Sequence, residues 1–211
     1  MTTARCETPH AAAWSAEGDW LALVDAHGGL DIHEISSGRI VTQTPSDACV
    51  TLRSTKDVSP RGLLSFGRPS DRVFLVHEEG LQHVVPGARH EKQFFTFPKL
   101  AGLVARGPRG SVLFASARAE DAATGPYRIE TFRADGRKSG AAPIAVDGEV
   151  LSLACVAGEP AWIVRREDRA KVSTGADLSQ LGKVRRAWLE PDGSVVYVAE
   201  RVAGEEPTPR S

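Results

Sequence analysis

Two runs of alternating apolar and polar residues, Trp20 to Asp25 and Leu30 to Ile35, stand near the start of the chain. A turn containing Gly28-Gly29 joins them, and a second turn, Ser36-Ser37-Gly38, closes the unit. Alternation interrupted by glycine-containing turns is typical of short antiparallel β-strands. The stretch from Trp14 to Arg39 is therefore predicted to form one small β-sheet.

The same strand-turn-strand pattern recurs along the chain at intervals of roughly 40 residues. In each recurrence the second strand is rich in β-branched or aromatic residues, which favour strands. Aligned on the residue before the first turn, the predicted hairpins are Trp14 to Val24, Phe66 to Val76, Ala105 to Ala115, Ala154 to Val164, and Trp188 to Val198. This recurrence predicts a nearly all-β protein whose hairpins lie side by side around a common axis.

Further strands are predicted where short apolar runs lie between turns. They cover Leu81 to Val85, Gln93 to Phe97, Tyr127 to Phe132, Pro143 to Val146, and Ala170 to Ser173. An insertion from Ser46 to Arg61 holds one more candidate strand, Cys49 to Arg53, and lengthens the first interval. Thr174 to Gly182 is interpreted as a loop or a short helical turn, and no amphipathic helix of useful length is visible.

The unit from Trp14 to Arg39 resembles one blade of the WD-repeat family of β-propellers. Ser15-Ala16-Glu17-Gly18 matches the first turn of such a blade, His27-Gly28-Gly29 matches the second, and Leu189-Glu-Pro-Asp-Gly193 matches the first turn again. His33-Glu34 stands where the family has Trp-Asp, so the resemblance implies the fold and no functional residue. We expect a small β-propeller of about five blades with an incomplete last blade. The alternative is an open propeller arc that a partner completes.

The last unit holds only two predicted strands, Arg185 to Leu189 and Ser194 to Arg201. An open sheet edge presents unpaired backbone groups, so propellers usually close their ring with a terminal strand. Thr2 to Thr8 is the one spare candidate for this closure. We expect residues 1–203 to form a single domain and residues 204–211 a disordered tail.

The charge balance argues against two classes of partner. The chain has 211 residues, which suffice for one sizeable core. These residues include 26 Lys and Arg and 27 Asp and Glu, which gives a formal net charge of -1. No field of the whole molecule then draws it to nucleic acid or to an anionic membrane. We expect protein partners, with no nucleic acid and no membrane.

The three cysteines, Cys6, Cys49 and Cys155, are far apart and form no Cys-x-x-Cys pair, so neither a zinc site nor a redox motif is indicated. A sparse, odd count suits a reducing cytosol. Met1 to Ala13 has no apolar core of signal-peptide length. We expect a cytoplasmic protein, and the abundance of Arg, Ala, Gly and Val suggests a bacterial one.

One candidate metal site lies in the first unit. Asp31 and His33 are two apart on one predicted strand, and His27 stands in the adjoining turn. This spacing could serve a metal ion, but position 33 is where a propeller packs an aromatic side chain. No third ligand is fixed by the sequence, so a structural or surface role is favoured, and we predict no metal and no cofactor.

Two further histidines, His77 and His83, lie on the predicted strands of the second unit. A two-residue turn would pair His77 with Gln82 and Val76 with His83, which points the two rings to opposite faces. They are therefore not expected to act together, and a catalytic role for either is disfavoured.

The remaining candidate motifs favour structural roles. No serine stands in Gly-x-Ser-x-Gly, and Gly107-Pro-Arg-Gly110 is interpreted as a hairpin turn instead of a phosphate loop. The cations Arg165, Arg166, Arg169, Arg185 and Arg186 could meet an acidic partner, but interspersed Glu167 and Asp168 favour a solvated surface. Trp14, Trp20, Trp162 and Trp188 fall within the aligned hairpins, which predicts core packing for all of them.

Two functions from different classes follow from these observations. The leading hypothesis is a non-enzymatic protein–protein interaction module or scaffold, a subunit of a bacterial multiprotein assembly. The alternative is a propeller enzyme, a hydrolase or lyase acting on a sugar or a small ester. A cluster of Asp, Glu and His at the central channel would favour the enzyme. No catalytic residue is assigned from the sequence.

Overall fold

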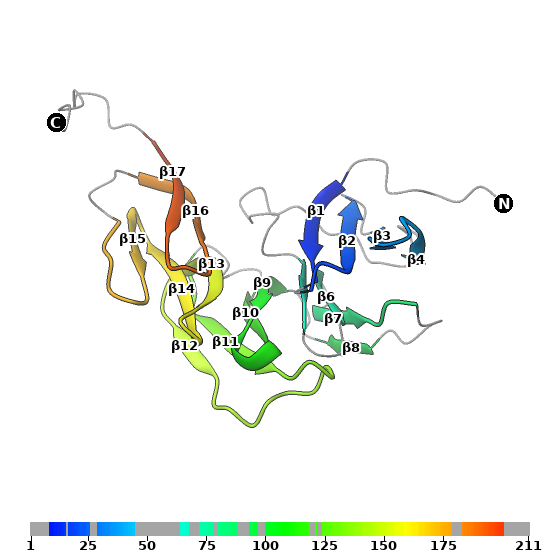
Figure 1. Ribbon diagram of the computed structural model, residues 1–211. Coiled ribbons are helices and arrows are strands. Elements are labelled where there is room, and N and C mark those ends of the chain that lie inside the picture. Colours follow the sequence, from blue (N-terminus) through cyan, green and yellow to red (C-terminus); the bar gives the residue numbers. More distant parts are fainter. Residues whose placement is uncertain are drawn as a thin grey trace.

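The structure, a computed structural model, describes residues 9–15, 17–25, 29–44, 64–67, 72–77, 80–87, 93–96, 100–118, 121, 124–178 and 183–200. Within these ranges the chain forms β-strands, the short 3-10 turn η2 (Pro108–Gly110) and no α-helix (Figure 1). None of the described residues belongs to a helix that is long and apolar enough to cross a membrane. The prediction of a nearly all-β protein is confirmed.

The strands form five antiparallel sheets, which we number in chain order. The first four-stranded sheet contains β1 (Pro9–Trp14), β2 (Trp20–Asp25), β3 (Leu30–Glu34) and β4 (Ile40–Thr44). The second contains β5 (Leu64–Phe66), β6 (Val73–His77), β7 (Gly80–Val84) and β8 (Gln93–Thr96). The third contains β9 (Leu100–Arg106), β10 (Val112–Arg118), β11 (Tyr127–Phe132) and β12 (Ile144–Val146). The fourth has three strands, β13 (Glu149–Val156), β14 (Glu159–Arg166) and β15 (Arg169–Val172), and the fifth has two, β16 (Lys183–Leu189) and β17 (Val195–Glu200).

The predicted hairpins are the first two strands of the five sheets, and they pair as antiparallel ladders. Corresponding backbone bonds close four of these hairpins: the N–H groups of Ser15, Gly67, Gly107 and Glu190 donate to the carbonyls of Trp20, Arg72, Ser111 and Ser194. These bonds make Arg106 and Leu189 the counterparts of Trp14 and Phe66. The sequence alignment on Ala105 and Trp188 is therefore wrong by one residue, and a shift of one residue turns a side chain to the other face of its sheet.

Glycine at the turns explains why the chain reverses at these places. Gly18 and Gly193 have φ of 81° and 86°, a left-handed conformation that costs glycine little. Their N–H groups donate to the carbonyls of Ser15 and Glu190, so the turns of the first and fifth sheets share one geometry. The two stretches that match the same turn of a propeller blade therefore form the same kind of turn.

The first strands of successive sheets lie side by side: β1 packs against β5, β5 against β9, β9 against β13, and β13 against β16 (Figure 1). Residues from all five line one central cavity of 390 Å³. A cavity surrounded by the innermost strand of each sheet is the arrangement of a propeller around its axis. The predicted fold class, a small β-propeller of five blades with an incomplete last blade, is confirmed.

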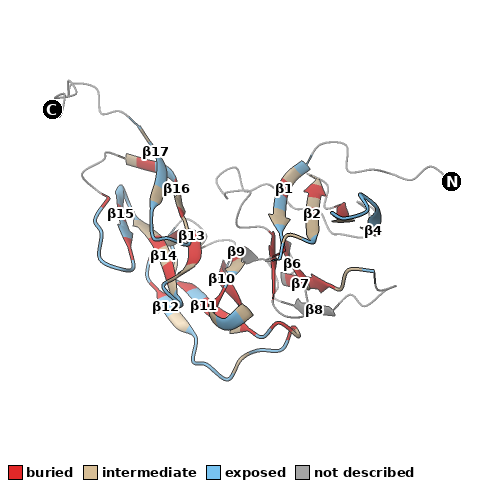
Figure 2. Cartoon of the chain, in the orientation of Figure 1, coloured by how far each residue is buried: buried red, intermediate tan, exposed pale blue. Residues whose placement is uncertain are grey.

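Buried side chains fill the junctions between successive sheets. One apolar cluster joins the first three sheets, a second joins the third sheet to the fourth, and a third joins the fourth to the fifth. Burial is highest in the second and third sheets, for example along β6 and β10, whereas β1 has one buried residue and β17 has none (Figure 2). Among the described residues no such cluster joins the fifth sheet to the first, so the packing is sequential from the first blade to the last.

Three predictions fall on residues outside the described ranges. They are the strand Cys49 to Arg53 within the insertion Ser46 to Arg61, the closing strand Thr2 to Thr8, and the tail at residues 204–211. Most of Thr174 to Gly182, predicted as a loop or helical turn, is described up to Leu178. It begins with a turn, and Asp177 forms an isolated bridge with Lys171.

Candidate interaction site

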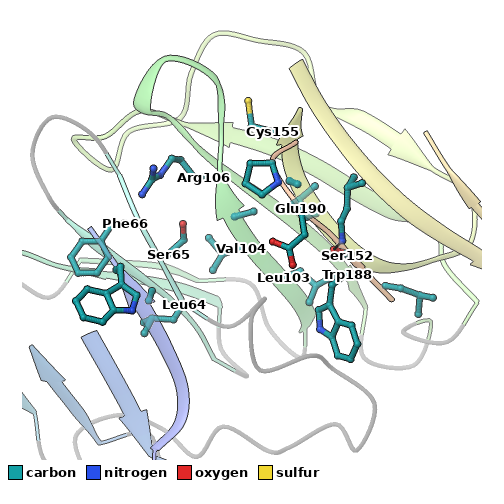
Figure 3. Close-up of a pocket in the computed structure, with 18 residues that line it drawn as sticks. Leu64, Ser65, Phe66, Leu103, Val104, Arg106, Ser152, Cys155, Trp188 and Glu190 are labelled. Atoms are coloured by element: carbon teal, nitrogen blue, oxygen red, sulfur yellow. Dashed lines mark hydrogen bonds between the residues drawn. The ribbon is translucent and has the colours of Figure 1, made fainter. Parts of the chain in front are cut away.

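The central cavity collects residues from the innermost strands. Its walls contain Ala13 and Trp14 from β1, Leu64–Phe66 from β5, Leu103–Arg106 from β9, Leu151–Cys155 from β13, and Trp188 with the following turn from β16 (Figure 3). Most of these side chains are apolar because they also belong to the junctions between sheets. The cavity is thus the inner surface of the packed blades.

Few polar groups reach this cavity. Arg106 and Glu190 enter it from β9 and from the turn after β16 (Figure 3). Ser152 also lines it, but its Oγ accepts a hydrogen bond of 2.9 Å from the backbone N–H of Leu189, which ties the fourth sheet to the fifth. Cys155 is a half-buried free thiol on the wall. Ser65 of β5 lines the cavity as well, so the arrangement offers one cation, one carboxylate and a few small polar groups on otherwise apolar walls (Figure 3).

This lining bears on the enzymatic alternative. Glycoside hydrolysis uses two carboxyl groups, spaced about 5 to 9.5 Å apart, on either side of the reacting bond. Among the described lining residues Glu190 is the single carboxylate, and there is no histidine. No group of three or more His, Cys, Asp and Glu that could hold a metal ion occurs in the described part of the chain. The cavity therefore does not favour the hydrolase or lyase.

The candidate metal residues of the first sheet do not converge on such a group. Asp31 is buried and His33 is half-buried. In the ladder between β2 and β3, Asp31 lies opposite Leu23 and His33 lies opposite Leu21. His27, the third candidate, lies outside the described residues. Asp31 and His33 therefore belong to the packing of this sheet.

His83 is fully buried at the junction between the second and third sheets. Its ring lies 5.6 Å from that of Phe74, and its Nδ1 is 3.0 Å from an Arg72 guanidinium nitrogen. A Cβ at Gly136 would come within 2.4 Å of the His83 Nε2, so a turn of the third sheet fits directly against the ring. His83 therefore packs between blades, a role that its spacing two residues after buried Leu81 could have indicated.

The predicted pairing of the two histidines is wrong by two residues. The register places His83 opposite Phe74, and it places Gly80, not Gln82, opposite His77. Two residues separate β6 from β7, as predicted, but the turn begins one residue earlier in the chain than the predicted pairing required. The side chain of His77 lies outside the described part of the structure.

The predicted cation clusters lie where the fourth and fifth sheets meet. Arg165 binds Glu149, with 2.8 Å between Nε and Oε2, and also donates to the carbonyl of Val184 at 3.1 Å. Arg166 pairs with Asp147 at 2.8 Å, and Lys183 pairs with Asp168 at 2.5 Å. The Lys183 ammonium holds the pKa of the Asp168 carboxyl below its usual value.

These pairs support the solvated-surface interpretation of the cations. Arg185, also in the predicted clusters, forms an ion pair with Glu200 on β17. Most members are exposed, so each pair adds little stability. Three of the five predicted arginines are thus engaged within the chain.

The tryptophans do not share one role. Trp20 packs against the core of the first sheets, and Trp162 packs against the cluster between the third and fourth. Trp14 is 56% exposed, and Trp188 is half-buried at the cavity. Core packing is therefore wrong for Trp14. Trp188 is not fully buried between blades, because the buried residue of that turn is its neighbour Leu189.

The outer strand of the last blade exposes three consecutive apolar residues. β17 has the sequence Val-Val-Tyr-Val-Ala-Glu, and its middle residues Val196, Tyr197 and Val198 are 51%, 41% and 51% exposed. Alternate residues of a strand point to opposite faces, so apolar groups are exposed on both faces of β17. A continuous apolar run of this kind is usual in a strand whose two faces are both covered by other parts of the protein.

The last strand of each sheet has a free edge in the described chain, and β17 is the longest of these strands. Like β17, the last strands β4 and β8 carry no Lys or Arg, whereas β12 and β15 differ from it. β12 has three residues, and β15 carries Arg169 and Lys171, both devices that discourage pairing with other chains. β17 has six residues and a single charge, on Glu200. Within the described chain no strand pairs with its outer side. We call Val195–Glu200 the open edge.

The backbone of the open edge is set by the turn before it. The Glu190 N–H donates to the Ser194 carbonyl, and antiparallel pairs alternate between bonded and non-bonded. With Val196 opposite Trp188 and Tyr197 opposite Ala187, this alternation directs the backbone groups of Val196 toward β16. The N–H and C=O groups of Val195, Tyr197 and Ala199 therefore point away from β16.

Comparisons with known proteins identify no family for this sequence. No family model matches it, and no curated protein matches it. The WD40 domain of SCAP from fission yeast is 9% identical over 76% of this chain and 40% of its own, with a TM-score of 0.49. A chain of the Mitotic Checkpoint Complex is 15% identical over 89% of this chain and 73% of its own, with a TM-score of 0.49.

A structural genomics protein of unknown function from Bacteroides thetaiotaomicron is 13% identical, with a TM-score of 0.48. The match covers 74% of this chain and 44% of that protein. The chain thus spans less than half of two of these three matched chains. The assignment of a propeller rests on the five sheets and the cavity that they surround.

Proposed function

We propose that this protein is a non-enzymatic interaction module that binds another polypeptide by adding a strand to the open edge. The observation that carries the proposal is the incomplete last blade, whose outer strand exposes Val196, Tyr197 and Val198 on its two faces. An exposed row of backbone N–H and C=O groups is a template for strand addition, in which main-chain bonds supply affinity.

The chemistry of the open edge defines the partner that it suits. Apolar side chains on both faces favour a partner strand with β-branched or aromatic residues. The lack of Lys and Arg on β17 removes the usual barrier to such pairing. We place this activity in a cytoplasmic multiprotein assembly of a bacterium.

Capture of partners by variants of the open edge tests the proposal. Tyr197→Pro removes one outward N–H group and leaves the hydrogen bonds between β16 and β17, because proline is tolerated where the strand faces outward. Tyr197→Thr is the matched control, since it removes the ring and keeps the N–H group. The full chain, wild type or variant, is used as bait in extract of the native host, and bound proteins are identified by mass spectrometry.

We expect a partner that the wild type and the Thr variant retain and that the Pro variant loses. Circular dichroism must show that the Pro variant keeps its β-structure. Retention of the same partners by all three baits would overturn strand addition at the open edge.

A further inference from the structure

We infer that the open edge pairs with the open edge of a second copy of this chain, so that the last blades of two molecules form one continuous four-stranded sheet. This inference rests on the proposed function and names its partner. The backbone, the side chains, the charge and the size of the blade each support a two-fold antiparallel pairing centred on Tyr197.

The backbone of β17 is self-complementary about Tyr197. Its outward groups belong to Val195, Tyr197 and Ala199, which are spaced evenly around that centre. In a two-fold antiparallel pair, Tyr197 faces Tyr197 of the second copy, and Val195 faces Ala199. All the outward N–H and C=O groups of one copy then meet outward groups of the other.

The side chains are also compatible with this register. On one face Val196 lies opposite Val198 of the second copy, and the reverse pair lies beside it, which brings four half-exposed valines together. On the other face the two tyrosine rings meet at the centre. Each exposed apolar residue of the open edge thereby gains an apolar neighbour.

No like charges oppose one another in the pair. Glu200, the only charged residue of β17, would lie opposite Ser194 of the second copy. Glu200 already forms an ion pair with Arg185 on the adjacent strand, so its charge is balanced within its own sheet. A carboxylate facing a hydroxyl does not oppose pairing, whereas facing carboxylates would.

The size of the resulting sheet matches the other blades. The first, second and third sheets have four strands each, and the fifth has two in the described chain. Joining two fifth sheets gives the strand order β16-β17-β17-β16, again four strands. Both copies complete their last blade through one shared surface, as a two-fold interface requires.

A charge exchange at the centre of the pair tests this register. Tyr197→Lys and Tyr197→Glu each place like charges opposite one another in a dimer of the same variant, whereas a mixture places Lys opposite Glu. We expect a dimer of the wild type by sedimentation velocity. Each variant alone should have a dissociation constant raised about tenfold or more, and the equimolar mixture should recover the dimer.

Hydrogen exchange of the wild type gives a measurement that needs no variant. The N–H groups of Val196 and Val198 bond to β16 and should stay protected at all concentrations. Those of Val195, Tyr197 and Ala199 should be protected only at concentrations where the dimer forms. Fast exchange of these three at every concentration would overturn the inference, even if both charge variants failed to fold.

The remaining outcomes separate this inference from the proposed function. A monomeric wild type that still captures a partner through a Tyr197→Pro-sensitive contact overturns the second copy and leaves strand addition standing. Dimers of equal strength in all variants place the interface elsewhere and overturn the inference. A monomer that dimerises only after deletion of residues 1–8 shows that the chain's own N-terminal segment occupies the edge, which also overturns it.

Discussion

Apolar side chains are buried to very different degrees in two regions of the molecule. One region is the junction between the second and third sheets, and the other is the open edge of the fifth sheet. At the junction, Phe74, His83, Phe114 and Phe132 are fully buried, and Gly136 of one blade fits against the His83 ring of the other. On the fifth sheet, residues of the same apolar kind are about half exposed. The strands of the two regions are similarly rich in apolar residues but have different neighbours.

This difference shows that strand composition specifies burial only together with a neighbour. β10 and β17 both consist mainly of apolar residues, Val-Leu-Phe-Ala-Ser-Ala-Arg and Val-Val-Tyr-Val-Ala-Glu. β10 is the second strand of a four-stranded sheet between two others, and β17 is the last strand of a two-stranded sheet. The exposed apolar residues of β17, which pairs with β16 on one side only in the described chain, are the basis of the proposed strand addition.

The largest expected effect contrasts one aromatic residue from each region. Phe114→Ala should lower the free energy of unfolding by about 3 to 5 kcal/mol, because the ring is fully buried against Phe132, with centroids 6.2 Å apart. Tyr197→Ala, at 41% exposure, should cost less than about 1 kcal/mol in the monomer. Urea denaturation at low protein concentration measures both. Equal losses would remove the contrast between the two regions.

A glycine-to-alanine pair tests the close fit at the junction. Gly136→Ala should destabilise by about 1 to 3 kcal/mol more than Gly158→Ala, because only the first Cβ would collide with a buried ring. The two positions have φ of 86° and 84°, so the backbone cost of alanine is shared and cancels in the comparison. Thermal unfolding of the two variants gives the difference. Equal melting temperatures of the two variants would contradict the close contact between Gly136 and the His83 ring.

A hydroxyl deletion tests how firmly the fifth sheet is held. Ser152→Ala leaves the N–H of Leu189 without its partner in a buried place and should cost about 1 to 3 kcal/mol. Ser173→Ala is matched to it, since Ser173 Oγ accepts from the N–H of Trp162 at 3.0 Å in an exposed place, where water can substitute. We expect the Ser173 variant to lose less than half as much by urea denaturation. A reversed order would mean that the fifth sheet is attached mainly by its other contacts.

The hairpins could be predicted from the sequence because their causes are local. Alternation and turn glycines lie within a few residues of one another, and Gly18 and Gly193 adopt the conformation that the pattern implied. The burial of Trp14 and Trp188 could not be predicted in the same way. A one-residue shift in alignment exchanges the two faces of a strand, and only the hairpin-closing bonds show which residue is equivalent to Trp14.

The candidate site depended on tertiary neighbours that the sequence does not display. His83 meets Gly136, which lies in a different blade, and no local pattern connects them. The two-strand last unit, by contrast, was visible, because the number of strands follows from counting apolar runs. What the counting could not give is the exposure of Val196 and Val198, since that depends on whether another sheet covers them.

The smallest expected effect concerns the turn that begins the open edge. The Ser194 hydroxyl and the Ser194 backbone N–H both donate hydrogen bonds to the Asp192 carboxylate, and the backbone N–H lies 2.8 Å from Oδ1. These hydrogen bonds lower the pKa of Asp192. A carboxyl whose pKa is lower in the folded state stabilises the fold above its unfolded pKa of about 3.9, and the contribution is lost as the pH falls through the folded pKa.

Asp192→Asn keeps an acceptor oxygen and removes the titration. The melting temperature of the wild type should therefore fall slightly more than that of the variant between about pH 5 and pH 2. Because Asp192 is exposed, the difference should be the least of those proposed here. Asp135→Asn should behave alike, because Asp135 is a partly exposed turn carboxyl of the third sheet whose pKa is also lowered. A steeper acid loss in the Asp192 variant than in the wild type would contradict the assigned direction of the pKa.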